Sequence, residues 1–356
     1  MSAALILLAA GGASILTFVC GRFLSQRDWL ADKPGPRSSH EKATPRTGGI
    51  AVMTAFFIAA SGVSRLDPAT LKFIALTAGA FALGLADDVR PLPAAVKLLG
   101  QMLIASLFVI VLGSVSVVPA PFVGEVTLGI FAPALTVFWI VAFMNAYNFM
   151  DGANGLAATA AIFALSALGV AAAGGGEAAW AGQSIILAAA IFGFLPLNFP
   201  KARLFLGDGG SQAIGFAAAA LGALVAKSEA GSALFLPTVF MPFLFDVAFT
   251  LLHRSARRQK LAEAHNEHLY QLLIRLGASH TTVTSIYLAL IALATLAAIF
   301  GAALPASAQF ITPVALLAAF AAPAIIIFNK AKAAGLLTPR ALPAKPQARP
   351  FARAAE

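Results

Sequence analysis

Two adjacent aspartates, Asp87 and Asp88, directly follow an apolar stretch in the segment GLADDVRPL at residues 84–92. Carboxylates side by side repel each other, and beside a medium of low dielectric constant one of them has its pKa raised unless a cation neutralises the pair. A divalent metal ion, or a proton shared during catalysis, would remove that repulsion. The pair is therefore a candidate for a catalytic or metal-binding site, with a solvated helix end as the ordinary alternative.

Two further segments combine acidic and amide side chains with glycine. NAYNFMDGANGLA at residues 145–157 contains Asn148 and Asp151, and LNFPKARLFLGDGGSQ at residues 197–212 sets Asp208 among three glycines. Glycine permits tight turns, amides and carboxylates orient ligands, and the first amides of a helix can face a phosphate. A simple helix connector is the alternative for either segment taken alone.

The available side chains predict a hard metal ion. Oxygen ligands without cysteine favour Mg²⁺, with Mn²⁺ as the second candidate. The single cysteine, Cys20, excludes a disulfide within the chain and any cysteine-based metal site. His265 and His268 are three residues apart, as in some zinc sites, but no third ligand of the usual type is evident.

Composition places these residues in a membrane. Of the 356 residues, 60% are apolar and 11% are charged, and the mean hydropathy is +0.87. Soluble domains average about 45–50% apolar and about 25% charged residues, so we expect an integral membrane protein. Apolar runs long enough to cross about 30 Å of hydrocarbon recur along the chain. We predict an all-α polytopic fold of about 11 transmembrane helices, at residues 2–24, 48–64, 70–86, 94–118, 126–147, 154–173, 179–197, 211–227, 231–252, 281–303 and 309–329.

The distribution of lysine and arginine predicts the orientation. With the N-terminus periplasmic, all of the 24 basic residues except Arg65, Lys72 and Lys227 fall on one side, which the positive-inside rule makes cytoplasmic. The C-terminus is then cytoplasmic too. The expected cytoplasmic loops are 25–47, 87–93, 148–153, 198–210 and 253–280.

The same reading gives the domain organisation. Residues 1–329 are predicted to form one transmembrane domain, and residues 330–356, rich in proline, alanine and basic residues, are predicted to be a disordered cytoplasmic tail. A nucleic-acid partner would require a soluble basic domain, and the sequence has none. The surrounding membrane lipid is the expected environment, and the oligomeric state, a homodimer included, stays open.

This orientation brings aspartates from four places in the chain to one membrane surface. Asp87, Asp88, Asp151 and Asp208 fall at cytoplasmic helix ends, and Asp246 lies about two turns before the end of the ninth span. An ionisable residue inside a span is a functional candidate, and here a pair with His253 is one hypothesis. A buried hydrogen bond between helices is the alternative for Asp246.

Two cytoplasmic loops carry basic residues that suit a polyanionic substrate. Arg46 lies in the segment 32–49, and Arg258, His265 and His268 lie in the loop 253–280. Arginine and lysine bind phosphate oxygens, and a divalent ion can bridge them. The same charges are also what the positive-inside rule requires, so topology alone is the alternative explanation.

Four motifs together resemble a known family. DDVRPLPAAVK, NAYNFMDGANG, FLGDGGS and HLYQLLIRLG occur in the order found in the polyprenyl-phosphate N-acetylhexosamine-1-phosphate transferases, glycosyltransferase family 4. The resemblance covers roughly residues 28–280. It implies a helical bundle of the bacterial inner membrane, with its active site on the cytoplasmic face. It also implies transfer of an amino-sugar phosphate from a UDP-N-acetyl amino sugar to undecaprenyl phosphate, with release of UMP and with Mg²⁺.

The resemblance also implies roles for individual residues. Asp87, Asp88 and His268 would be catalytic, and Asp151 and Asp208 would bind the metal ion. The implied substrate-binding residues are Lys97, Asn148, Asn198, Arg46, His265 and Arg258.

Two departures from the family pattern narrow the expected branch. Asn154 stands where many members have a second aspartate, and the histidine-rich motif is reduced to His268 with His265 nearby. The reduced motif argues against the peptidoglycan branch and favours the branch that starts O-antigen or another surface polysaccharide. The alternatives are a member specific for UDP-GlcNAc that acts in another envelope polymer, and an ion-coupled transporter.

Overall fold

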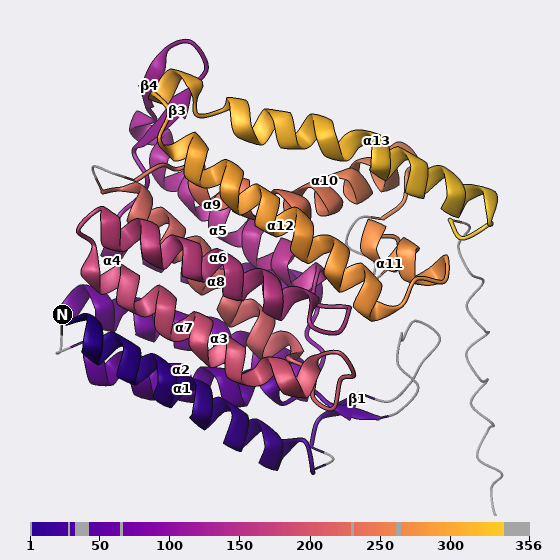
Figure 1. Cartoon of the computed structure of the whole chain (residues 1–356), viewed down its shortest axis with the longest axis horizontal. Helices are drawn as coiled ribbons and strands as arrows, with labels where there is room; N and C mark the ends of the chain where they lie inside the picture. The colour runs from indigo at the N-terminus through magenta and orange to yellow at the C-terminus, as the bar shows by residue number, and fades with distance from the viewer. Residues whose placement is uncertain are drawn as a thin grey trace, which may run out of the picture.

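The protein is a bundle of long helices (Figure 1). The computed structural model describes residues 2–27, 29–32, 43–64, 67–228, 231–260 and 265–337. Within these ranges, nine helical segments are long and apolar enough to cross a membrane, which confirms the all-α polytopic fold. The helices of these segments are α1 (Ala3–Leu24), α3 (Pro68–Val89), α4 (Ala94–Leu112), α5 (Ala132–Phe149), α6 (Leu156–Gly174), α7 (Ala178–Asn198), α8 (Gly207–Ala226), α12 (His280–Ala302) and α13 (Ile311–Ala333).

Shorter elements complete the chain. The remaining helices are α2 (Gly48–Val63), α9 (Phe235–Val239), α10 (Met241–Ala256) and α11 (Leu269–Arg275), with 3-10 turns η1 (Gly129–Phe131) and η2 (Ala306–Ala308). Two antiparallel hairpins are formed by β1 (Ala31–Asp32) with β2 (Thr44–Pro45), and by β3 (Val117–Ala120) with β4 (Gly124–Thr127). The hairpin β3–β4 lies at the opposite end of the bundle from α11 (Figure 1).

Three predicted spans differ from the observed helices, for local reasons. The fourth and fifth were predicted to cover residues 117–118 and 126–127, which instead belong to the β3–β4 hairpin. Gly113, at φ +85°, ends α4, and Pro119 and Pro121 lack the amide that a helix requires. The ninth span is broken between α9 and α10, where Pro242 occupies the first turn of α10.

Several predicted boundaries between helices and loops also differ from the observed ones. Asp87 and Asp88 lie in the last turn of α3, and Asp208 lies in the first turn of α8, so none of them is in a loop. The sequence of residues 258–276 has a helical pattern, but among the residues described there only α11 forms a helix. At the C-terminus α13 continues to Ala333, so the start of the predicted tail is helical, and residues 338–356 lie outside the described residues.

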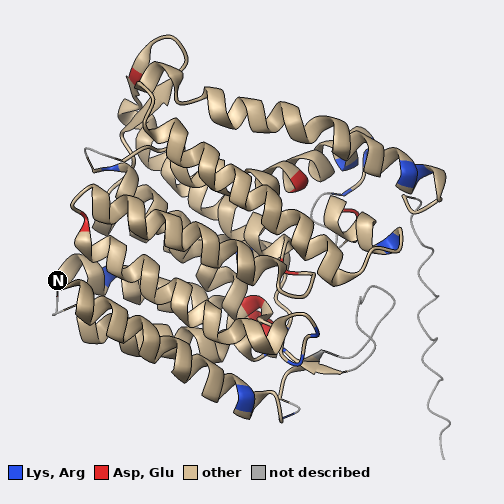
Figure 2. Cartoon of the chain, in the orientation of Figure 1, with Lys and Arg blue, Asp and Glu red and all other residues tan. Residues whose placement is uncertain are grey.

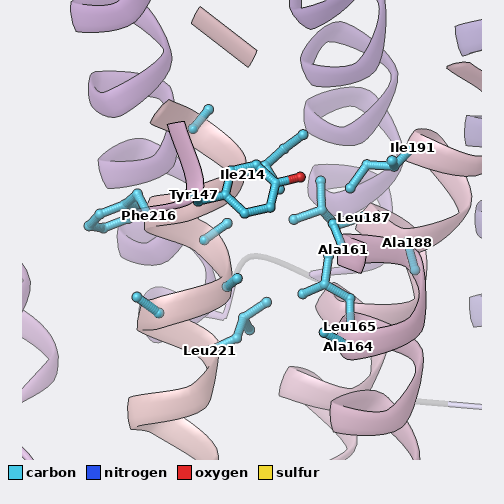
Figure 3. Close-up of a cluster of buried hydrophobic side chains, with 14 of the residues drawn as sticks. Tyr147, Ala161, Ala164, Leu165, Leu187, Ala188, Ile191, Ile214, Phe216 and Leu221 are labelled. Atoms are coloured by element: carbon cyan, nitrogen blue, oxygen red, sulfur yellow. The ribbon is translucent and has the colours of Figure 1, made fainter. Parts of the chain in front are cut away.

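Helix α8 is the centre of the bundle. It is buried along nearly its whole length and packs against α3, α5, α2 and α6. Its alanines and glycines permit close approach of neighbouring backbones, which is how helices associate where lipid gives no hydrophobic driving force. Figure 3 shows side chains of this core, where Tyr147 of α5 lies beside Ile214 of α8 and faces Leu187 of α7. The Tyr147 hydroxyl donates to the Ala157 carbonyl at 2.9 Å, so the core places α6 as well.

Glycines mark the closest helix contacts, and these lie beside the aspartates. A Cβ on Gly84 of α3 would lie 2.2 Å from the Asp208 carbonyl oxygen, and a Cβ on Gly49 of α2 would lie 2.4 Å from the Gly210 amide nitrogen. Any side chain at these positions would push the start of α8 away from α3 or α2. The glycines therefore fix the distance between Asp88 and Asp208.

Replacing Gly84 with alanine tests this contact. Because the added methyl group meets backbone, we expect a loss of about 1–3 kcal/mol in stability and a lower unfolding temperature in detergent. Gly79→Ala, on the same helix, is the matched control, because its Cβ would have only Ile104 side-chain atoms at 3.9 Å. That control should be neutral or slightly stabilising through helix propensity. Equal unfolding temperatures for the two variants would contradict the packing described here.

Candidate active site

Asp87 is paired with a lysine from the next helix. Its Oδ2 lies 2.8 Å from Lys97 Nζ, and its Oδ1 accepts a hydrogen bond from the Leu92 amide at 2.6 Å. Lys97 Nζ also lies 3.8 Å from Asp208 Oδ2. The α3–α4 turn closes so that one ammonium group compensates two carboxylates.

Asp88 has a different partner from its neighbour. Its two oxygens accept the backbone amides of Asp208 at 3.0 Å and of Gly209 at 2.8 Å. Both amides belong to the first turn of α8, where backbone donors have no intrahelical acceptor and the helix dipole favours a negative charge. The adjacent aspartates are therefore compensated separately, one by a lysine and one by a helix N-terminus.

Asn148 joins the segment at residues 145–157 to the segment at residues 197–212. Its Nδ2 donates to Ser211 Oγ at 2.7 Å and lies 3.3 Å from Asp208 Oδ1. The end of α5 is thus held against the first turn of α8, as expected if Asn148 and Asp208 serve one site.

Asp151 lies in the turn between α5 and α6 and faces other carboxylates. Burial raises the pKa of Asp151 well above its usual value, and the charges of Asp208 and Asp88 raise it further, while Arg46 opposes them. Arg46 comes from the segment beside β2, which is joined to the start of α8 by backbone hydrogen bonds from Phe205 to Pro45 and from Gly48 to Phe205, both 2.8 Å. The structure thus brings Arg46 and Asp151 to the same cluster.

The acidic cluster lies at one end of the bundle, where α3 ends and α8 begins (Figure 2). The described residues contain no group of three His, Cys, Asp or Glu side chains that forms a ready-made metal site. Mg²⁺ commonly binds one or two carboxylates together with substrate phosphates and water, so a three-residue cage is not required. Burial and then repulsion from Asp208 and Asp88 raise the pKa of Asp151, and a divalent cation relieves such repulsion, so Asp151 and Asp208 are the candidates to hold such an ion.

Asn198 holds the loops rather than facing the cluster. Its side-chain oxygen accepts the Gly155 amide at 2.7 Å and its Nδ2 donates to the Leu204 carbonyl at 2.9 Å. Both groups of the amide are used by backbone, so Asn198 connects the turn after Asp151 to the segment before Asp208. Asn154 has a similar place, since its Nδ2 donates to the Pro200 carbonyl at 3.1 Å.

The histidine loop is anchored by Asp246. His268 Nδ1 lies 3.2 Å from Asp246 Oδ1, whereas His253 contacts the Phe249 carbonyl at 3.0 Å, so the hypothesis of an Asp246–His253 pair is wrong. The His268 ring packs between Phe149, at the end of α5, and His265. The structure therefore brings His268 to the element that carries Asn148.

The remaining predicted residues of this loop have different environments. Burial lowers the pKa of His265 to about 3, with His268 and Arg254 adding to the effect, so His265 stays neutral at physiological pH and offers a hydrogen bond rather than a charge. Arg258 is exposed and has φ +55°. Arg254 and Arg257 both pair with Glu267, which ties α10 to the loop before α11.

A buried amide network lies one helical turn deeper in the bundle than Lys97, Asp208 and Asn148. Gln101 Nε2 donates to Gln212 Oε1 at 2.9 Å, and Asn145 Nδ2 donates to Gln101 Oε1 at 2.7 Å. The network joins α4, α8 and α5 directly beneath Lys97, Asp208 and Asn148. Gln101 and Gln212 are not among the residues predicted from the sequence, although an amide four residues from a site residue, inside an apolar run, is a usable signal.

Lys97→Met tests the ion-pair arrangement. Without the ammonium group, Asp87 and Asp208 face each other uncompensated, so we expect a lower unfolding temperature and a loss of turnover of about tenfold or more. Lys201→Met, an exposed lysine on the loop before α8, is the matched control and should leave both unchanged. Wild-type turnover in Lys97→Met would contradict the arrangement.

Comparison with known proteins shows the family of the chain. The family model for glycosyl transferase family 4 matches residues 70–226. The chain is 34% identical over 266 residues to the probable undecaprenyl-phosphate N-acetylglucosaminyl 1-phosphate transferase of Bacillus subtilis (strain 168), with 72% of this chain and 73% of the relative covered. The chain belongs to glycosyl transferase family 4. It is thus a transferase of that family as well as a multi-pass membrane protein.

Two further relatives are similar over 318 and 209 residues. The decaprenyl-phosphate N-acetylglucosaminephosphotransferase of Mycobacterium tuberculosis (strain ATCC 25618 / H37Rv) is 32% identical over 318 residues, covering 79% of this chain and 78% of the relative. The phospho-N-acetylmuramoyl-pentapeptide-transferase of Moorella thermoacetica (strain ATCC 39073 / JCM 9320) is 35% identical over 209 residues, covering 55% and 65%. The residues matched by the family model run from α3 to α8, so they contain all four aspartates of the cluster but not His268.

Proposed function

We propose that the protein transfers an N-acetylated amino-sugar 1-phosphate from a UDP-sugar to undecaprenyl phosphate, giving undecaprenyl-diphospho-sugar and UMP. A phosphate oxygen of the lipid forms a bond to the β-phosphorus of the UDP-sugar. The bond from that phosphorus to the bridging oxygen breaks, and its electron pair leaves with UMP. The single observation that carries the proposal is the gathering of Asp87, Asp88, Asp151 and Asp208, with Lys97 and Arg46, at one end of a transmembrane bundle.

The chain's own residues have distinct parts in this reaction. Asp87 and Lys97 orient the attacking phosphate, and Arg46 and Lys97 compensate phosphate charge. Asp88 keeps the first turn of α8 in place, and Asn148 fixes the Asp208 side chain. His268 contacts the sugar-linked phosphate, and His265 and Arg258 line the approach of the nucleotide. Positioning and compensation of charge are the main contributions in phosphoryl transfer.

A bound Mg²⁺ ion would neutralise the diphosphate charge, and Asp151 and Asp208 are the residues that would hold it, with Mn²⁺ as the substitute. We assign Asn198 a positioning part, because its amide is occupied by the backbone of two loops.

An apolar groove supports the lipid acceptor. A cavity of about 710 Å³ lies between α4 and α5 and is lined by apolar side chains such as Leu98, Met102 and Phe138. Leu98 directly follows Lys97 in α4, and the lining continues to Ile110 of α4, so one end of the groove is at the end of α4 that carries Lys97. A polyprenyl chain in this groove would have its phosphate at the end of the bundle where Asp87 and Lys97 lie.

The same family relationship supports a proposal for the physiological setting. We propose a bacterial inner-membrane enzyme with its active site on the cytoplasmic face, acting at the first membrane step of O-antigen or another surface polysaccharide. The reduced histidine motif supports this branch, with a 6-deoxy amino sugar as the donor to test beside UDP-GlcNAc.

Release of UMP tests the reaction. The purified protein, given undecaprenyl phosphate, Mg²⁺ and one of UDP-GlcNAc, UDP-GalNAc, UDP-FucNAc or UDP-QuiNAc, should release UMP only when both the lipid and the metal ion are present. The preferred sugar identifies the donor. Absence of UMP with every sugar, from protein with a cooperative unfolding transition, would favour the transporter alternative.

Asp208→Asn tests the metal assignment. Losing one charged ligand should lower turnover by about 10²-fold, by analogy with the removal of one electrostatic contact to a transition state. Glu125→Gln is the control, because Glu125 is exposed on β4 at the opposite end of the bundle, and it should keep wild-type turnover. Near-normal turnover in folded Asp208→Asn protein would show that the assignment is wrong.

A further inference from the structure

Asp246 is a fully buried carboxylate that accepts five hydrogen bonds. Its Oδ1 accepts the Leu269 amide at 2.8 Å, His268 Nδ1 at 3.2 Å and Thr250 Oγ1 at 3.3 Å. Its Oδ2 accepts the Tyr270 amide at 3.1 Å and the Tyr287 hydroxyl at 2.5 Å. A buried charge is costly unless it is hydrogen-bonded on all sides, and here every lone pair has a donor.

Three of the five donors belong to the loop that carries His268. The amides of Leu269 and Tyr270 are the first of α11, so Asp246 of α10 holds the start of α11 as well as the histidine ring. A histidine whose Nδ1 faces a carboxylate carries a proton on that nitrogen, and the hydrogen bond fixes the ring orientation. The other ring nitrogen, Nε2, is then the one left for substrate.

The contact extends from α11 to the turn of Asp151. The Tyr270 hydroxyl donates to the Phe149 carbonyl at 3.0 Å, and burial together with the charges of Asp246 and Asp151 raises the pKa of Tyr270, so the hydroxyl keeps its proton. A Cβ on Gly152 would lie 2.0 Å from this hydroxyl oxygen, so the turn packs directly against Tyr270. Asp246, α11 and the turn at 149–152 therefore form one connected unit.

We propose that Asp246 is a positioning residue, which through His268 and Tyr270 sets the histidine and the Asp151 turn against the substrate diphosphate. This inference rests on the proposed function. Asp246 itself does not contact substrate. It affects turnover only through the residues that it holds in place.

Kinetics of single and double variants test the assignment. Asp246→Asn should lower kcat about tenfold or more, with a KM for the UDP-sugar within about threefold of wild type. In the His268→Gln background, Asp246→Asn should lower kcat by a smaller factor than it does in wild type, because the part of its effect that runs through His268 is already lost. Thr295→Val is the matched control: it removes a hydrogen bond to the Ile291 carbonyl within α12, which does not involve Asp246, and should keep kcat. Effects that multiply in the double variant, or wild-type kcat in Asp246→Asn, would overturn the inference.

Tyr270→Phe gives a second test, which leaves Asp246 intact and removes only the hydroxyl, with its contacts to Phe149 and Gly152. It should lower kcat while the unfolding temperature stays close to that of Thr295→Val. If Asp246→Asn does not fold, this comparison decides, and equal kcat in Tyr270→Phe and Thr295→Val would overturn the inference.

Nitrogen NMR separates this inference from the proposed function, because it needs no activity. In protein with ¹⁵N-labelled histidine, the His268 signal, identified by its loss in His268→Gln, should report a proton on Nδ1 in wild type. In Asp246→Asn that proton should be lost from Nδ1 or shared with Nε2. An unchanged His268 signal would overturn the pairing, whereas absence of UMP release by wild-type protein would count against the proposed function instead.

Discussion

Two backbone amides at the start of α8, those of Asp208 and Gly209, donate to the carboxylate of Asp88, and this contact joins the end of α3 to the central helix. Asp88 lies at the C-terminal end of α3, where the dipole of its own helix disfavours a negative charge. The N-terminus of α8 supplies the compensation. Because Gly84 lets the two backbones meet, the contact also fixes where Asp208 stands relative to Asp87 and Lys97.

The same arrangement, a carboxylate that accepts the first amides of another helix, occurs a second time at the histidine loop. Asp246 of α10 accepts the first amides of α11, just as Asp88 of α3 accepts the first amides of α8. In both places a carboxylate from one helix determines where another helix begins, and the residue carried there, Asp208 or His268, is one that the sequence marks for chemistry. Asp88 and Asp246 thus hold helix starts, whereas Asp87, Asp151 and Asp208 are the carboxylates that we propose face the substrate.

The sequence predicted the class of fold and most of the cluster, because long apolar runs and positive charge are strong signals in a membrane protein. It placed the aspartates on one surface through topology alone. It did not separate the roles of Asp87 and Asp88, because their partners, Lys97 and the α8 amides, come from elements 10 and about 120 residues away. The predicted partner of Asp246 was likewise wrong. Spacing along one helix suggested His253, and only the fold brings His268 to Asp246.

Residue type also suggested a different role for a side chain that is hydrogen-bonded to backbone groups. Asn198 carries the amide expected of a substrate ligand, yet both its polar groups hold loops, and nothing in its local sequence distinguishes the two uses. Hydropathy likewise predicted helix across part of the β3–β4 hairpin, because Val117 and Val118 are as apolar as the helix before them. Such errors concern how loops close, and loop closure depends on contacts between distant segments.

The most direct test of the account follows the phosphorus atoms of the donor. The purified protein would be given undecaprenyl phosphate, Mg²⁺ and UDP-GlcNAc, or the preferred UDP-sugar, labelled with ³²P at the β-phosphate. Transfer of sugar 1-phosphate predicts that the label moves into the lipid extract, while a label at the α-phosphate stays in water as UMP. Label from the β-phosphate that remains in water while sugar appears on the lipid would contradict the account.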